Sequence, residues 1–141
     1  MTPPFINSIN NRVTWGECDP AGIVFYPNYF RMFNMATDEL FSAAGFALNV
    51  LMVNFDIVGY PMIDTRAVFI LPNKFGDMLT ITSYISKWGK SSFEVKHEIS
   101  NSHGLSVKGF EKRVWAYMTE DGTLKGRPVP DAVKTKLAAV T

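Results

Sequence analysis

One acidic residue, Asp19, stands in a setting that suits acyl-transfer chemistry. It lies in the turn-rich segment 18–22, Cys-Asp-Pro-Ala-Gly, directly before a stretch whose apolar residues follow helical spacing. The first backbone N–H groups of a helix have no partner inside the helix, and with the helix dipole they can stabilise a developing oxyanion. A carboxylate facing such donors can attack a carbonyl carbon or deprotonate the water that does so. The sequence therefore makes Asp19 a candidate catalytic carboxylate.

The residues that could do chemistry also have simpler structural interpretations. Asp19 before Pro20 is the pattern of an Asx-turn or a helix cap. Cys18 is interpreted as a small buried residue, because neither histidine lies near it in sequence to activate the thiol. His97 falls on the apolar side of a predicted strand and is expected in the core or at an interface, whereas His103 is expected in an exposed turn.

The predicted elements place Asp19 between a strand and a long helix. We expect a strand over residues 6–17, a helix over about 25–44, and a short helix or loop over 46–56. Four further strands are predicted at 57–71, 78–88, 92–101 and 105–118. The helical segment is apolar around most of its circumference, so it should be buried. An α+β hotdog fold satisfies this order: a five-stranded antiparallel sheet wrapped around one long central helix, with a second copy pairing at its edge.

The last predicted strand contains an irregular pattern. The apolar alternation changes phase between Val107 and Val114, and Gly109 lies between them, which predicts a β-bulge. The basic residues of the later strands and turns are expected to be mostly solvated; these are Lys87, Lys90, Lys108, Lys112 and Arg113.

Composition limits the function classes. The chain has 141 residues, enough for one domain over 1–141, and its net charge of +1 gives no general attraction to nucleic acid or to acidic membranes. The single cysteine excludes an intramolecular disulfide and a cysteine-based zinc site. No apolar run approaches the ~20 residues of a membrane span, and the first residues lack a signal-peptide pattern. We therefore expect a cytoplasmic protein.

The segment from Asp19 to Tyr29, Asp-Pro-Ala-Gly-Ile-Val-Phe-Tyr-Pro-Asn-Tyr, resembles the signature of the 4-hydroxybenzoyl-CoA thioesterase family of hotdog proteins. Shorter matching pieces are residues 57–62, 87–88 and 92–93. The resemblance implies hydrolysis of an acyl-CoA thioester by Asp19, with the backbone N–H of Tyr26 polarising the thioester carbonyl. It also implies a homodimer or homotetramer with CoA near a subunit interface, and no metal or redox cofactor.

Departures from the family pattern bear on the substrate. The helix position expected to accept a phenol hydroxyl carries an acid in the hydroxybenzoyl-specific enzyme, and here it is Asn34, whose amide brings no charge. The basic pair expected after Trp88 is reduced to Gly89-Lys90, which leaves Lys90 as the candidate CoA phosphate contact. Tyr60 stands where a smaller polar residue is expected. The predicted substrate-binding set is therefore Phe25, Phe33, Asn34, Tyr60 and Lys90.

Several functions remain open at this stage. An aromatic acyl group is the first expectation, a short or medium aliphatic group the second, and a thioester on a carrier protein a third. A hotdog dehydratase or hydratase would need a histidine beside a carboxylate, and residues 1–96 contain no histidine. A non-catalytic acyl-CoA-binding module would use the same pocket without turnover.

Overall fold

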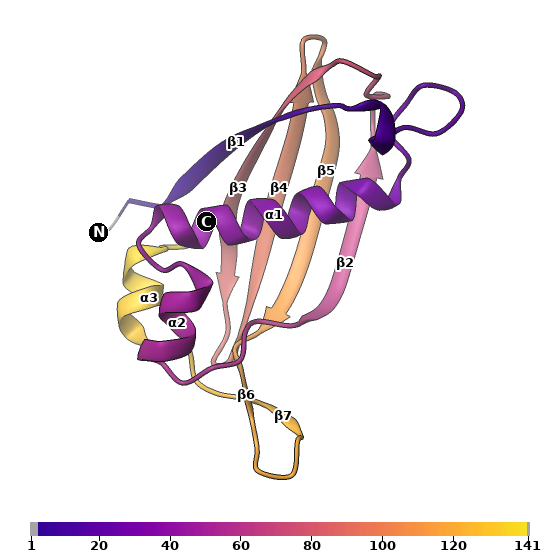
Figure 1. Cartoon of the computed structure of the whole chain (residues 1–141). Coiled ribbons are helices and arrows are strands. Elements are labelled where there is room, and N and C mark those ends of the chain that lie inside the picture. The colour runs from indigo at the N-terminus through magenta and orange to yellow at the C-terminus, as the bar shows by residue number, and fades with distance from the viewer. Residues whose placement is uncertain (1–2, 141) are drawn as a thin grey trace.

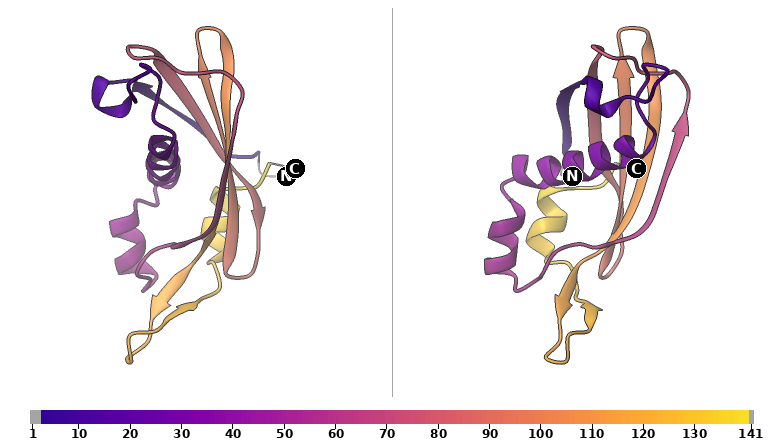
Figure 2. Two further views of the ribbon diagram at one scale, coloured as in Figure 1. Left: turned by 90° about the vertical axis from the view of Figure 1, so that its right-hand side faces the viewer. Right: turned by 45° about the vertical axis from the view of Figure 1, so that its right-hand side comes forward.

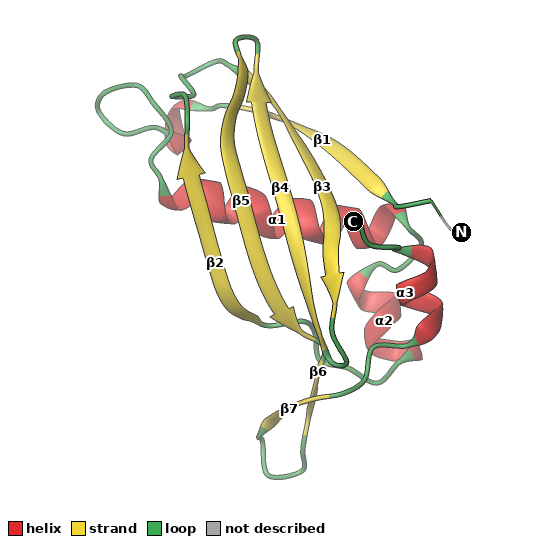
Figure 3. Ribbon diagram, turned by 180° about the vertical axis from the view of Figure 1, so that it is seen from behind, coloured by secondary structure: helices red, strands yellow, loops and turns green. Residues whose placement is uncertain are grey.

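The computed structural model describes residues 3–140 and shows an antiparallel sheet curled around a long helix (Figure 1). The sheet has five strands in the order β1-β3-β4-β5-β2. Their bounds are β1 (Ile6–Arg12), β2 (Met62–Phe69), β3 (Met78–Trp88), β4 (Ser92–Asn101) and β5 (Gly104–Val114). Helix α1 (Pro27–Ala43) crosses one face of this sheet, and the view from behind shows the strands lying over it (Figure 3). The predicted hotdog fold is confirmed.

Helix α1 forms and ends where its sequence allows. Pro27 occupies the first turn, where its missing N–H costs no hydrogen bond. Gly45, which follows the helix, adopts a positive φ of 90°, a conformation that glycine reaches without strain. One face of the helix is buried, through Tyr29, Met32, Phe33, Ala36, Thr37, Leu40 and Phe41. The opposite face is exposed in the chain.

Some predicted boundaries were too long. The first strand ends at Arg12, and residues 15–17 form a short 3-10 helix, η1 (Trp15–Glu17), instead of continuing it. The second strand begins at Met62 and not at residue 57. The last predicted strand divides after Val114, because β6 (Ala116–Met118) leaves the main sheet and pairs with β7 (Leu124–Gly126). The ambiguous segment 46–56 contains a helix, α2 (Leu48–Asn54).

Two apolar clusters lie beneath α1. One surrounds the first half of the helix and includes Met32, Ile81 and Val107. The other surrounds its second half, where α2 and α3 (Asp131–Lys136) cover the end of the core through Leu51 and Val133. Figure 2 shows these two short helices grouped at one end of the sheet, away from the loop that precedes α1.

The predicted bulge at Gly109 is wrong. Gly109 pairs regularly with His97 on one side and Ala67 on the other, and the register shifts lie elsewhere, between Ile99 and Ser100 and near the start of β2. A Cβ built on Gly109 would lie 2.4 Å from Cζ of Phe33. The glycine is therefore needed to let the Phe33 ring lie directly on the strand.

The apparent change of phase in β5 has a different cause. The side chains that face α1 alternate without interruption through Val107, Gly109, Glu111 and Arg113, all of them buried. The alternation of inward and outward side chains is regular, but two of the inward positions carry the charged residues Glu111 and Arg113. The strand geometry is therefore uninterrupted, although the alternation of apolar and polar residues is not.

Among residues 3–140 no single helix has the length and apolar character needed to cross a membrane. The pair α1 and α2, with a bend of 61° between them, meets those criteria on length and composition alone.

We predict that Gly109→Ala destabilises the protein by about 2 kcal/mol, because the added methyl group overlaps the Phe33 ring and must displace packed atoms. Gly16→Ala is the control, since a Cβ there meets nothing within 4 Å. Urea unfolding of the two variants and the wild type measures both effects. Equal midpoints for Gly109→Ala and Gly16→Ala would contradict the packing argument.

Candidate active site

The loop that carries Asp19 is closed by its own hydrogen bonds. The Asp19 N–H donates to the Ile23 carbonyl at 2.9 Å, and the Gly22 N–H donates to the Asp19 carbonyl at 2.9 Å. The Asp19 Oδ1 atom accepts the Ala21 N–H at 2.8 Å, which is the expected Asx-turn. Within residues 3–140 this is the one hydrogen bond to the Asp19 carboxylate, so its second oxygen is available.

Neighbouring segments fix this loop against the helix start. Glu17 accepts the Phe25 N–H at 2.8 Å and the Asn28 side-chain amide at 2.9 Å on its backbone carbonyl. Its carboxylate accepts the Thr14 N–H at 2.9 Å. Glu17 is therefore a structural residue that ties the loop to the first turn of α1.

Asp19 and the start of α1 open onto one cavity of about 490 Å³. Phe25 and Tyr26 line it from the helix start, and Phe69 and Ile70 line it from the end of β2. The Tyr26 N–H has no hydrogen-bond acceptor among the described residues, and the next residue, Pro27, has no N–H at all. Asp19 and Tyr26, whose backbone N–H is unpaired, therefore line the same cavity.

Tyr29 is a residue of this cavity that the sequence analysis did not single out. Its hydroxyl accepts the Asn73 amide at 3.0 Å, and Asn73 in turn accepts the Asn101 amide at 2.9 Å. The orientation of Asn101 follows from the His103 N–H, which donates to its amide oxygen at 2.8 Å. Desolvation raises the pKa of Tyr29, so the phenol keeps its proton. The sequence could not predict this contact, because Asn73 lies 44 residues after Tyr29 and no pattern relates the two.

Cys18 does not have the environment of a nucleophile. Its thiol donates to the Thr14 carbonyl at 3.4 Å. Desolvation, followed by the charges of Asp19 and Glu17, raises the pKa of the thiol. The structure thus favours a neutral thiol that is no nucleophile. The prediction that Cys18 is buried is wrong, because the side chain is only half-buried.

Four of the predicted substrate-binding residues lie in four different places. Phe25 lines the Asp19 cavity. Phe33 is fully buried and stacks on His97 with ring centroids 5.0 Å apart, so it belongs to the core. Asn34 is exposed on α1 in a separate hollow. Lys90 lies in the turn between β3 and β4, at the end of the sheet away from the Asp19 loop (Figure 1).

Tyr60 is buried and structural in this chain. Its hydroxyl donates to Asp38 Oδ1 at 2.7 Å, and its ring packs on Phe41 and Phe93. Desolvation, and then the hydrogen bond to Asp38 and its charge, raise the pKa of Tyr60. The Tyr60 hydroxyl is therefore a permanent donor that ties the segment before β2 to α1.

A buried polar network lies between α1 and the sheet, and the sequence analysis missed it. Glu111 accepts hydrogen bonds from Thr37 on the helix, from Nε2 of His97 at 3.0 Å and from Nη2 of Arg113 at 2.8 Å. Ser83 bonds to the other ring nitrogen of His97 at 2.6 Å. His97 is buried, as expected. The expectation that Arg113 is solvated is wrong, because it is only 5% exposed.

The protonation of Glu111 follows from these partners. Burial alone would raise its pKa, but the hydrogen bonds and charges of His97 and Arg113 outweigh burial and lower the pKa below its ordinary value of 4.5. The carboxylate is therefore ionised inside the core. The alternation of side chains along β5 is the one sequence signal that could have predicted that Glu111 and Arg113 face the core side by side.

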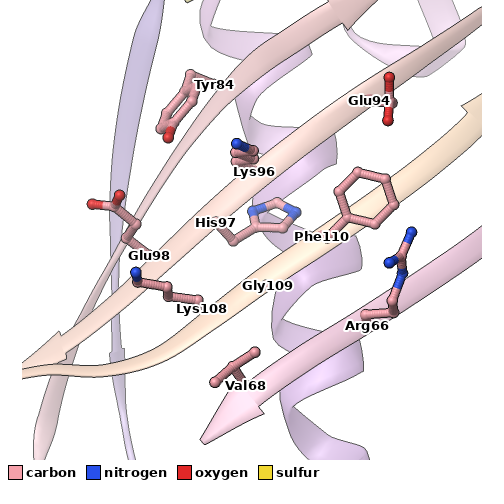
Figure 4. A pocket seen from close by; sticks show the side chains of 10 residues that line it. All are labelled: Arg66, Val68, Tyr84, Glu94, Lys96, His97, Glu98, Lys108, Gly109 and Phe110. Atoms are coloured by element: carbon pink, nitrogen blue, oxygen red, sulfur yellow. The ribbon is translucent and has the colours of Figure 1, made fainter. Parts of the chain in front are cut away.

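A further hollow lies on the face of the sheet away from α1 (Figure 4). It has a volume of about 430 Å³ and is lined mainly by charged and aromatic side chains: Arg66, Tyr84, Glu94, Lys96, Glu98, Lys108 and Phe110. None of the predicted site residues lines it. The candidate active site is therefore the cavity at Asp19.

Comparison with known proteins agrees with this architecture. The chain matches the model of the thioesterase-like superfamily over residues 13–137. It is 33% identical over 129 residues to 4-hydroxybenzoyl-CoA thioesterase of Pseudomonas sp. strain CBS-3, an alignment that covers 87% of this chain and 91% of that protein. The solved structure of that enzyme superposes with a TM-score of 0.86 at 31% identity, over 93% of this chain and 98% of that one.

Other similar proteins carry related names. A solved gentisyl-coenzyme A thioesterase is 30% identical, with a TM-score of 0.80 and coverage of 91% of this chain and 99% of that one. A 1,4-dihydroxy-2-naphthoyl-CoA hydrolase of Prochlorococcus marinus strain MIT 9515 is 28% identical over 118 residues, covering 76% of this chain and 77% of that protein.

The curled sheet, the buried helix and the carboxylate loop before it define a hotdog-fold protein. The match to the family model over residues 13–137 identifies the superfamily. The chain belongs to the thioesterase-like superfamily.

We predict that Glu111→Gln lowers the free energy of unfolding by about 3 kcal/mol at neutral pH, because Arg113 then keeps a buried charge without a charged partner. In the wild type the contribution of Glu111 is complete above about pH 4.5 and is lost as the pH falls through its lowered pKa. The variant should therefore lose less stability than the wild type on acidification.

Urea unfolding from pH 7 down to pH 3 measures both effects. Glu98→Gln is the control, since Glu98 is exposed on the same sheet and should change stability by no more than about 0.5 kcal/mol. Wild-type stability and acid dependence in Glu111→Gln would contradict the assignment of a buried ion pair.

Proposed function

We propose that Asp19 is the carboxylate with which this chain hydrolyses an aromatic acyl-CoA thioester to the free acid and CoA. The chain is a thioester hydrolase, because it belongs to the thioesterase-like superfamily and proteins 33% and 30% identical to it are thioesterases. The observation that supports the assignment of Asp19 is its shared cavity with the unpaired Tyr26 N–H.

The geometry suggests a role for each group. The thioester carbonyl oxygen would accept the Tyr26 N–H, which lies at the positive end of the α1 dipole, so charge developing on this oxygen is stabilised. The Asp19 oxygen held by Ala21 fixes the carboxylate, and the other oxygen is free to act. In one route that oxygen attacks the carbonyl carbon, the C–S bond breaks to release the thiolate of CoA, and water then hydrolyses the acyl anhydride formed on Asp19. In the other route it takes a proton from the water that attacks the carbonyl carbon, the C–S bond breaks as the intermediate collapses, and the proton passes from Asp19 to the leaving thiolate.

An aromatic acyl group fits the lining of this cavity. Phe25, Tyr26, Tyr29 and Phe69 supply ring faces and edges around Asp19. Aromatic rings favour stacked and edge-to-face contacts with one another. The similar proteins named above act, by their names, on 4-hydroxybenzoyl, gentisyl and dihydroxynaphthoyl thioesters. We therefore place aromatic acyl-CoA ahead of aliphatic acyl-CoA as the substrate.

We also propose that the chain works as a homodimer or homotetramer. Strand β2 is an edge of the sheet, and it carries exposed apolar side chains, including Ile63, Val68 and Phe69. An edge strand of this kind is a template for pairing with another strand. Phe69 also lines the Asp19 cavity, so a second copy on this edge would help to enclose the substrate.

A cytoplasmic location is part of the proposal. Its support is the substrate class, because acyl-CoA is formed and used inside cells. Recovery of the protein outside the cytoplasm after cell fractionation would contradict this location.

Asp19→Asn should lower kcat at least 100-fold, because the amide keeps the Ala21 hydrogen bond but can neither attack nor accept a proton. Thiol release from a panel of aromatic and aliphatic acyl-CoAs measures the loss. Asp131→Asn, exposed on α3, is the control and should keep wild-type activity. Turnover by Asp19→Asn near the wild-type rate would refute the role of Asp19, and tight acyl-CoA binding without thiol release by the wild type would indicate a binding module.

Substitution of Ile63 and Val68 by Lys should convert the wild-type dimer or tetramer into a monomer, because charges on an edge strand oppose strand pairing. Sedimentation velocity gives the masses. Val53→Lys, on the exposed side of α2, is the matched control and should leave the assembly intact. A monomeric and fully active wild type would show that the cavity needs no second copy.

A further inference from the structure

Asn73 is a fully buried polar residue in the segment that joins β2 to β3. Burial of an amide costs free energy unless its donors and acceptor are satisfied, so each of its contacts has a structural reason. Leu71 and Pro72, which directly precede Asn73, line the Asp19 cavity, although Asn73 itself does not. The residue therefore lies directly behind the wall of the candidate active site.

The main chain of Asn73 holds the loop that carries Asp19. Its carbonyl accepts the Val24 N–H at 2.9 Å, and the next residue, Lys74, forms a β-bridge with Ile23. The Ile23 carbonyl in turn accepts the Asp19 N–H at 2.9 Å. Figure 1 shows the segment after β2 beside the loop that precedes α1. A series of backbone contacts thus runs from Asn73 through the returning side of the loop to Asp19.

The side chain of Asn73 connects the same segment to helix α1. Its amide N–H donates to the Tyr29 hydroxyl at 3.0 Å. Tyr29 lies in the first turn of α1, and its own backbone N–H donates to the Tyr26 carbonyl at 3.1 Å. Asn73 therefore contacts the Asp19 loop through its carbonyl and the start of α1 through its amide.

A backbone group sets the orientation of the Asn73 amide. The His103 N–H donates to Oδ1 of Asn101 at 2.8 Å, which leaves Nδ2 of Asn101 to donate to Oδ1 of Asn73 at 2.9 Å. Oδ1 of Asn73 therefore faces Asn101, and Nδ2 faces Tyr29. Because a backbone N–H can only donate, neither amide can rotate without losing a buried hydrogen bond. The connection to α1 is thus held in one geometry.

The two groups proposed to act on the thioester lie on either side of this connection. Asp19 belongs to the loop and the Tyr26 N–H to the helix start, and no hydrogen bond among the described residues joins Asp19 to Tyr26. Glu17 ties the loop to α1 from the side that precedes Asp19. Asn73 does so from the side that follows it. Such ties matter for catalysis, because a displacement of about 1 Å can cost on the order of 100-fold in rate.

We propose that Asn73 is a positioning residue for thioester hydrolysis, because it sets the Asp19 carboxylate relative to the Tyr26 N–H. It does not line the cavity, so it acts through the loop and through Tyr29 and not by contact with the substrate. This proposal rests on the proposed role of Asp19 in hydrolysis.

Asn73→Ala separates the two functions of this residue. The variant loses the amide that holds Tyr29 but keeps the carbonyl that accepts the Val24 N–H. We expect kcat to fall about tenfold or more and KM to change less than about twofold, because the cavity keeps its lining while the reacting groups lose their alignment. Thiol release from the best substrate of the acyl-CoA panel gives both constants.

Tyr29→Phe breaks the same hydrogen bond from the helix side and removes only one oxygen atom. It should lower kcat by a similar factor, and the double variant should be no slower than Asn73→Ala alone. Losses that do not add are the mark of two residues that act through one contact. If the two losses multiply instead, Asn73 and Tyr29 act independently and the positioning role is wrong. Should Asn73→Ala not fold, wild-type kcat in Tyr29→Phe would contradict the proposal equally.

Trp88→Phe is the control for a loss of stability alone. It removes the 2.8 Å hydrogen bond from Nε1 of Trp88 to the Leu137 carbonyl, at the end of the sheet away from the Asp19 loop (Figure 1). Urea unfolding should show that both Trp88→Phe and Asn73→Ala are less stable than the wild type, but only Asn73→Ala should lose kcat. Wild-type kcat in Asn73→Ala, or an equal loss in Trp88→Phe, would overturn the positioning role while hydrolysis itself stands. A wild type that hydrolyses no acyl-CoA would refute the proposed function instead.

Discussion

The carboxylate of Glu111 is the charge around which the interior of this protein is arranged. It is completely buried, and an isolated carboxylate in such a place would be too costly to keep ionised. Its partners come from three elements: Thr37 from α1, His97 from β4 and Arg113 from its own strand. The need to satisfy one buried charge thus fixes the helix relative to the sheet, more specifically than apolar packing alone would do.

The position of the network explains the division of the core. One apolar cluster surrounds the first half of α1 and the other its second half, and Thr37 lies on the helix between them. Phe33 stacks on the His97 ring and rests on Gly109, so the polar network is sealed by an aromatic side chain on one side. Sliding or rotation of α1 would expose Glu111 and separate Thr37 from it. The start of α1 at Tyr26, and with it the preceding loop that carries Asp19, is positioned as a consequence.

The sequence was sufficient where local chemistry decides the structure. The strands, the long helix and the loop at Asp19 all follow from alternation, helical spacing and Pro/Gly turns. It was insufficient where a residue's role depends on its partner across the fold. Arg113 was assigned to solvent together with the other basic residues of the later strands. Its burial depends on Glu111 and on Asn34, which lies 79 residues away in the chain. The role of Gly109 was predicted wrongly because it depends on the ring of Phe33, a residue of α1 that packs directly on the strand.

The two interpretations of Asp19 that the sequence left in competition prove to be compatible. One carboxylate oxygen accepts the Ala21 N–H and so performs the structural role of an Asx-turn residue. The other oxygen has no hydrogen-bond partner among residues 3–140 and shares a cavity with the Tyr26 N–H. A side chain anchored by one atom and free at the next is held in a single orientation, as a reacting group must be. The turn does not compete with catalysis here; it supplies the rigidity that catalysis by this carboxylate would require.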